Sequence, residues 1–112
     1  MDMIKRTISE IRDRIQKASS IKEKNKSKLL SLLSTLKSEV EELSKTKAEH
    51  AKSITGFTDI STHEATRENK NPELLKLSIE GLSSSVKGFE TSHPKLVKIV
   101  NSICFTLSNL GI

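Results

Sequence analysis

Residues 29–43 read LLSLLSTLKSEVEEL, and their pattern gives the clearest indication of the fold class. Leucine and valine recur in it at alternating spacings of four and three residues, which places them on one face of an α-helix. Neither proline nor glycine interrupts the pattern. The apolar face is only about two positions in seven wide, as in the contact seam of a coiled coil. The stretch therefore predicts a long helix with one aliphatic seam, formed by Leu29, Leu33, Leu36, Val40 and Leu43.

The same spacing continues toward both ends of the chain. On the N-terminal side it predicts a helix over residues 2–18, and we expect the central helix to cover residues 21–56. On the C-terminal side it predicts helices over residues 72–90 and 94–110. Residues 58–71 are polar and weakly periodic, which indicates a connector. The seams of the flanking helices are formed by Ile4, Ile8, Ile11, Ile15, Leu75, Ile79, Leu82, Val86, Phe89, Leu96, Val100, Ile103, Leu107 and Leu110.

Two helix starts carry residues that are typical of caps. Ser20 and Glu23 have the spacing of a capping box, which predicts a new helix there. A helix that continues across residues 18–20 is the alternative. The run Asn71-Pro72-Glu73 favours a second start, because asparagine caps the first free N–H groups and proline fits the first helical turn.

These elements predict an all-α fold and one helical domain over residues 1–112. A helix over residues 21–56 would be about 54 Å long, and the two C-terminal helices placed end to end would match it. We therefore expect an elongated helical hairpin or bundle with coiled-coil-like heptad seams. Only 34% of the residues are hydrophobic and 3% are aromatic, which is little for a thick core in one chain. We expect a homo-oligomer, a dimer or a tetramer, in which the copies cover each other's seams.

Lys47 and His50 fall where the seam of the central helix would continue. A polar residue at a seam position can fix the register or the number of subunits. The other interpretation is that the partner helix ends at this point. The sequence leaves both open.

The basic residues concentrate in the segment 17–28 of a chain with a net charge of +5. The candidate partner contacts in this segment are Lys22, Lys24, Lys26 and Lys28. The segment contains one acidic residue, Glu23. Such a patch can meet phosphates or an acidic protein. The alternative is a solvated helix start, since aromatic residues and a docking motif for nucleic acid are missing from the segment.

The sequence predicts neither catalysis nor a metal or cofactor site. The histidines at positions 50, 63 and 93 lack the close spacing of metal ligands. We expect His63 to be a solvated connector residue, and His93, which Pro94 forces out of the helical region, to cap the last helix. Cys104 lies in an apolar stretch and is expected to be a small buried residue. No window approaches the roughly 18 apolar residues of a membrane span, so we expect no membrane partner and a cytoplasmic location.

Residues 89–96 read FETSHPKL, and they are followed by Asn101, Ile103, Leu107 and the final LGI at 110–112. This stretch resembles the C-terminal signature of a family of small bacterial helical proteins that is known only as a domain of unknown function. The resemblance implies a small bacterial cytosolic protein and assigns no activity.

The pattern as a whole favours a non-enzymatic, self-associating helical scaffold or adaptor. We expect its seams to hold the assembly, and either the bend at His93 and Pro94 or the basic patch at 17–28 to meet an unidentified protein partner. The alternative is a nucleic-acid-associated protein that uses the basic patch weakly and without sequence preference.

Overall fold

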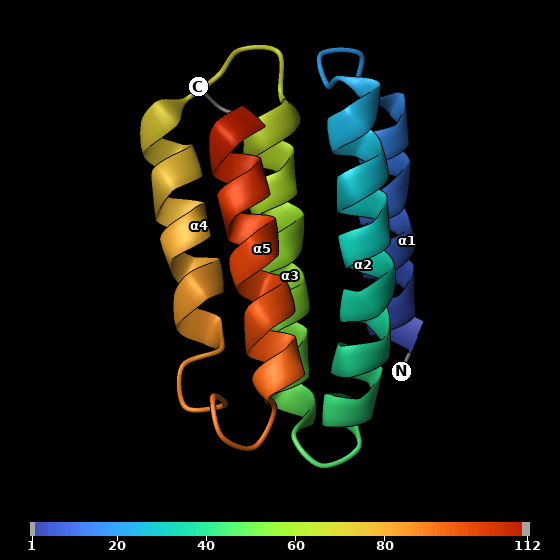
Figure 1. Ribbon diagram of the computed structural model, residues 1–112, viewed down its shortest axis with the longest axis vertical. Helices are drawn as coiled ribbons and strands as arrows, with labels where there is room; N and C mark the ends of the chain where they lie inside the picture. The colour runs from blue at the N-terminus through green and yellow to red at the C-terminus, as the bar shows by residue number, and fades with distance from the viewer. Residues whose placement is uncertain (1, 111–112) are drawn as a thin grey trace.

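Five α-helices run alternately up and down one long axis in the computed structural model (Figure 1). The structure describes residues 2–110, and within them it contains no strand. The all-α prediction is therefore confirmed. The helices are α1 (Asp2–Lys17), α2 (Glu23–Ser44), α3 (Ala48–Thr66), α4 (Pro72–Ser85) and α5 (Pro94–Leu110).

The helices form two layers. One layer contains α1, α3 and α4 side by side, and α2 and α5 pack together in front of it (Figure 1). Helix α3 lies in the middle and contacts all four other helices. The described part of the chain measures 37 × 24 × 21 Å and has a radius of gyration of 13.0 Å. The prediction of an elongated hairpin is therefore wrong.

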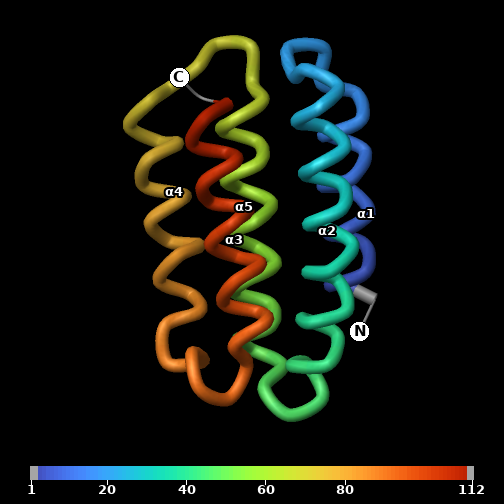
Figure 2. Tube along the Cα trace, viewed as in Figure 1, coloured from blue at the N-terminus to red at the C-terminus, as the bar shows by residue number. Residues whose placement is uncertain are grey.

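The elongated prediction fails because the chain turns where the aliphatic rhythm stops, after Leu43. The backbone N–H of Lys47 donates to the Leu43 carbonyl at 2.8 Å, and Lys47 itself lies outside the helical region with φ −136° and ψ 66°. The predicted helix over residues 21–56 is thus two antiparallel helices, α2 and α3 (Figure 2). Lys47 and His50 are both exposed, so no seam runs through them.

The predicted connector over residues 58–71 is also wrong, because α3 continues to Thr66. The buried side of α3 is made largely of small and hydroxyl-bearing residues. The hydroxyls of Thr55, Thr58 and Thr62 each donate to the carbonyl four residues earlier, at 2.8 Å. A threonine bonded in this way can be buried without leaving a polar group unpaired. The remaining connector is residues 67–71.

The other helix boundaries are closer to the predictions. Helix α1 ends one residue before the predicted 2–18, and α5 has the predicted range 94–110. Helix α4 ends at Ser85 and not at residue 90, and the loop after it contains Gly88 with φ +96°, a conformation that favours glycine. The Asn71 side chain caps α4 by accepting from the Leu74 N–H at 3.1 Å. The capping box is wrong, because Lys22 precedes α2 and makes no side-chain cap bond.

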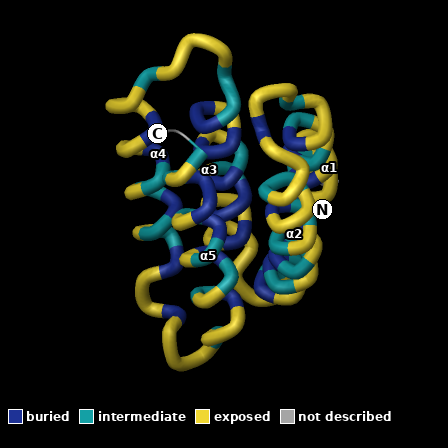
Figure 3. Tube along the Cα trace, turned by 45° about the horizontal axis from the view of Figure 1, so that its top comes forward, coloured by how far each residue is buried: buried dark blue, intermediate teal, exposed yellow. Residues whose placement is uncertain are grey.

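The aliphatic seams form one core inside a single chain. All the predicted seam residues are buried except Ile79 and Leu110, which are half-buried and pack against the core. Figure 3 shows buried positions on the inward sides of the helices and exposed positions outside. The seams are therefore covered by the chain's own helices, so they give no reason to expect a second copy. Residues 111 and 112 of the C-terminal signature lie outside the described residues.

Candidate functional site

Four large apolar side chains lie exposed on two neighbouring helices. Phe57 and Ile60 on α3 are 36% and 49% exposed, and Leu74 and Leu77 on α4 are 42% and 52% exposed. We name these four residues the α3/α4 apolar face. Met3 and Phe105 are also exposed but belong to α1 and α5.

Gly81 fixes the register of the two helices at this face. The Phe57 ring packs against the bare backbone of Gly81, and a Cβ at Gly81 would overlap the ring. Helices α3 and α4 are antiparallel neighbours. Three residues along α3 therefore bring Ile60 level with Ser78, the neighbour of Leu77, since each step along one helix matches a step back along the other. The four apolar side chains accordingly lie close together.

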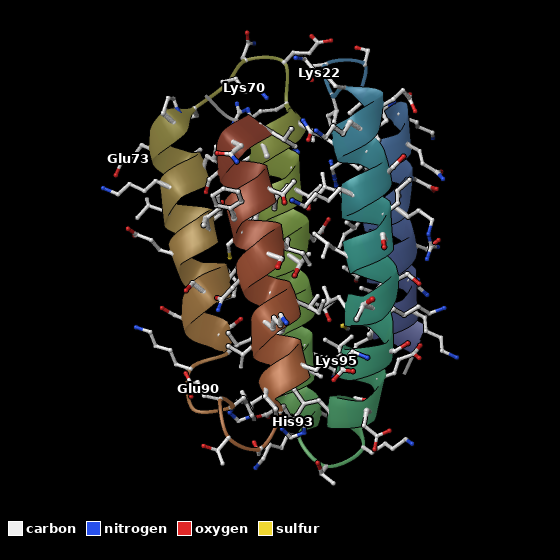
Figure 4. All side chains as sticks on the ribbon, in the orientation of Figure 1. Lys22, Lys70, Glu73, Glu90, His93 and Lys95 are labelled. Atoms are coloured by element: carbon white, nitrogen blue, oxygen red, sulfur yellow. The ribbon has the colours of Figure 1, made fainter. Side chains whose placement is uncertain are left out.

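Charged residues lie near the ends of α3 and α4. Glu49 is in the first turn of α3 and Arg67 follows its last turn, 18 residues later and hence on the same side of the helix. Glu73 is in the first turn of α4, where it projects away from the bundle (Figure 4), and Lys87 follows the end of α4. Arg67 donates to a carboxylate oxygen of Glu64 at 2.9 Å. Each of the two helices thus carries an acidic residue in its first turn and a basic residue just after its last turn.

The predicted basic patch is divided by the fold. Lys22, Lys24 and Lys28 are exposed, and Lys24 and Lys28 share one side of α2 because they are four residues apart. Lys26 turns toward α1, where its ammonium group donates to the Gln16 carbonyl at 3.0 Å. A cation is favourable there because the free carbonyls give a helix C-terminus a partial negative charge. Three of the four lysines therefore remain available to a partner.

His93 and Pro94 lie at the opposite end of the bundle from Lys22 (Figure 4). His93 precedes α5, and its carbonyl accepts the Val97 N–H at 3.2 Å, as expected of a cap. Its ring meets the buried Phe89 ring edge-on at 5.6 Å between centroids, and the His50 ring meets the same phenyl ring at 5.4 Å. The two proposed partner contacts, basic patch and bend, are therefore separate surfaces.

Helix α3 also places His63, which the sequence assigned to a connector. The Arg14 guanidinium of α1 lies 3.2 Å from His63 Nδ1 and 3.5 Å from an Asp59 carboxylate oxygen. These contacts tie α1 to α3. Their long distances and partly exposed side chains indicate a modest contribution to stability.

Cys104 is half-buried, with Sγ 3.9 Å from the Ile79 carbonyl. Burial raises the pKa of its thiol to about 11, so it is protonated at neutral pH and is a poor nucleophile. Among residues 2–110, no three His, Cys, Asp or Glu side chains are grouped to hold a metal ion. None of the described helices has the length and hydrophobicity to cross a membrane.

An open pocket of about 530 Å³ lies beside the N-terminal end of α1. Lys5, Lys45 and Lys52 line it together with Glu41, one of whose carboxylate oxygens is buried without a hydrogen-bond partner. Lys45 already pairs with Glu42 at 3.2 Å. The mixed charges of this pocket do not select one class of ligand.

Neither a curated protein nor a solved structure shows significant similarity to the chain. A family model described as a domain of unknown function (DUF4404) matches residues 4–112. This match covers nearly the whole chain and confirms the family that the C-terminal stretch resembles. The chain therefore belongs to the family of domains of unknown function designated DUF4404.

Proposed function

We propose that the protein is a non-enzymatic helical adaptor or scaffold that self-associates through the α3/α4 apolar face. The observation that carries the proposal is the position of four exposed apolar side chains on two adjacent helices, whereas the other exposed large hydrophobic residues, Met3 and Phe105, lie singly on α1 and α5. Exposed apolar residues grouped on one surface are typical of interaction sites, whereas scattered ones are ordinary. The family resemblance supports a bacterial cytoplasmic location as part of the same proposal.

A second copy is the partner that fits this face most simply. It presents the same apolar residues, so an isologous contact covers both faces at once. Full burial of a large apolar side chain is worth about 1.5–3 kcal/mol, so covering each half-exposed one contributes about 1 kcal/mol. Four from each copy contribute about 8 kcal/mol, against an association cost of about 4–15 kcal/mol. The self-association should therefore be weak and reversible.

Two features of the chain support the non-enzymatic part of the proposal. The raised pKa of Cys104, about 11, keeps its thiol protonated at neutral pH. His50 and His93 both pack against Phe89, whereas His63 contacts Arg14. The histidines are thus engaged in packing and in a contact between helices.

Sedimentation equilibrium tests the proposal. Over protein concentrations from about 10 μM to about 1 mM, the average mass should rise from 12.5 kDa toward twice that value. Ile60→Glu should keep the protein at 12.5 kDa, whereas Phe105→Glu, an equally drastic change on α5, should leave the rise intact. A mass of 12.5 kDa for the unmodified protein at every concentration would rule out self-association.

A second candidate function is weak nucleic-acid binding without sequence preference. It is favoured by Lys22, Lys24 and Lys28, which are exposed and make no ion pair among the described residues. Binding to single- or double-stranded DNA should then weaken steeply between about 50 and about 200 mM salt, and more so for the unmodified protein than for the Lys24→Gln, Lys28→Gln variant. The absence of binding at low salt would remove this candidate.

A further inference from the structure

We infer that two copies pair their α3/α4 apolar faces about a two-fold axis that runs parallel to the helices. In this arrangement α3 of each copy lies over α4 of the other. The inference rests on the proposed self-association and adds which helices and which residues meet.

In this arrangement the apolar residues of one copy lie against the apolar residues of the other. A two-fold axis parallel to the helices keeps the height of every residue along the bundle and exchanges the two sides of the face. Phe57 is level with Gly81, and Ile60 is within one residue of the level of Leu77. Ile60 of one copy therefore meets Leu77 of the second copy, and the contact occurs twice because the interface is isologous.

Opposite charges meet at both ends of the same arrangement. Counted from the contact of Phe57 with Gly81, Glu49 near the start of α3 lies within about two residues of the level of Lys87, just after α4. Arg67, just after α3, lies within about two residues of the level of Glu73, in the first turn of α4. When α3 lies over α4 of the second copy, each acidic residue faces a basic one. Neither Glu49 nor Lys87 forms an ion pair among the described residues of its own chain, so both are available to a second copy.

The other two-fold arrangement fits less well. An axis that lies in the face but crosses the helices would place α3 on α3 of the second copy and reverse the heights. If this axis is placed so that Glu49 faces Arg67, Leu74 and Leu77 in the first half of α4 face the second half of α4 and its end, where Ser84 is exposed. With the axis parallel to the helices, one arrangement both covers the apolar residues and pairs the opposite charges.

The size of the face agrees with a reversible dimer. From the lengths of α3 and α4 and the usual spacing of packed helices, the face measures about 25 Å by about 20 Å. Pairing would bury about 1,000 Å² in total, which is near the lower limit for a specific interface.

A charge exchange distinguishes the two arrangements. Glu49→Lys and Lys87→Glu should each weaken the dimer by about 5- to 10-fold, because each change affects two symmetric pairs. The double variant should restore the affinity, since Glu49 and Lys87 face each other only when α3 lies over α4. In the other arrangement Glu49 faces Arg67, so the double variant would be weaker than either single one. The melting temperature of dilute protein controls for effects on folding.

Disulfide formation between copies provides an independent measurement. In a Cys104→Ala background, a mixture of Ile60→Cys and Leu77→Cys chains should form mixed disulfide dimers faster than either variant alone. Phe105→Cys, with 65% exposure on α5, is the matched control and should form none above the rate of random collision.

The outcomes separate this inference from the proposed function. A dimer that forms but shows no restored affinity in the double variant, or that links Ile60→Cys chains faster to each other, overturns the inference alone. A chain that is monomeric at about 1 mM overturns the proposed self-association and the inference with it.

Discussion

Gly56 and Gly81 are a matched pair of helical glycines that test the packing of α3 on α4. A Cβ added at Gly56 meets no atom within 4 Å, whereas a Cβ added at Gly81 would overlap the Phe57 ring. The two alanine substitutions are therefore identical in chemistry and differ in their surroundings. We expect Gly56→Ala to stabilise the protein and Gly81→Ala to destabilise it or to leave it unchanged.

The expected magnitudes follow from two opposing effects. Alanine in place of glycine inside a helix stabilises by about 0.5–1 kcal/mol. Forcing an additional methyl group into a packed contact costs about 1–3 kcal/mol. Gly56→Ala should thus gain about 0.5–1 kcal/mol, and Gly81→Ala should lose up to about 2 kcal/mol. For a chain of this size the melting temperatures of the two variants should differ by about 2–12 °C.

Thermal unfolding followed by circular dichroism measures this difference. The same pair should be compared in a Phe57→Ala background, where the crowding at Gly81 is removed and Gly81→Ala should become stabilising. Equal gains from Gly56→Ala and Gly81→Ala with Phe57 present would mean that the Phe57 ring does not lie on Gly81. The register that places Ile60 next to Leu77 would then be wrong.

Three further outcomes are expected. Cys104, whose pKa burial raises from 9.0 to about 11, should react with iodoacetamide at pH 7.5 about 100-fold more slowly in native than in unfolded protein, and equal rates would contradict its burial. Leu36→Ala should lower the free energy of unfolding by about 2–5 kcal/mol in urea titrations, because Leu36 is fully buried, whereas Leu77→Ala should cost less than about 1 kcal/mol in the monomer. Replacing exposed Lys47 and His50 by leucine should shift the melting temperature of the monomer by less than about 3 °C, and a large increase would indicate a seam across the α2–α3 turn.

The sequence predicted best the helices whose buried side is aliphatic. In α1 the four isoleucines Ile4, Ile8, Ile11 and Ile15 mark the buried stripe, and the predicted range differs from the structure by one residue. In α5 the range is the predicted one, because Pro94 sets its start. In both helices the spacing of large aliphatic residues and a local break in the pattern are sufficient to predict the range of the helix.

The second half of helix α3, after residue 56, was predicted as a connector because its buried side does not look apolar in the sequence. Thr58, Ser61, Thr62 and Ala65 are buried in it, although none is a strong hydrophobic residue. Their small size allows α3 to lie in the middle of the bundle, and the threonine hydroxyls bond to the helix's own carbonyls. Small and hydroxyl-bearing residues that recur at helical spacing were the signal in the sequence for this buried side.

The α3/α4 apolar face was missed for a related reason. Leu74, Leu77 and Ile60 fall outside the four-three rhythm of their helices, so they belong to no predicted seam. A large aliphatic residue off the seam is a signal for a second apolar side. That these residues lie close together could not be predicted, because it depends on the contact between Phe57 and Gly81.

The proposed self-association requires that the α3/α4 apolar face holds two copies together. An amide NMR dilution series from about 1 mM to about 20 μM measures this claim residue by residue. Shifts that change with concentration should be confined to the outward residues of α3 and α4, with Ile60 and Leu77 among the largest. Spectra that do not change on dilution, or changes confined to α1, α2 or the loop before α5, would contradict it.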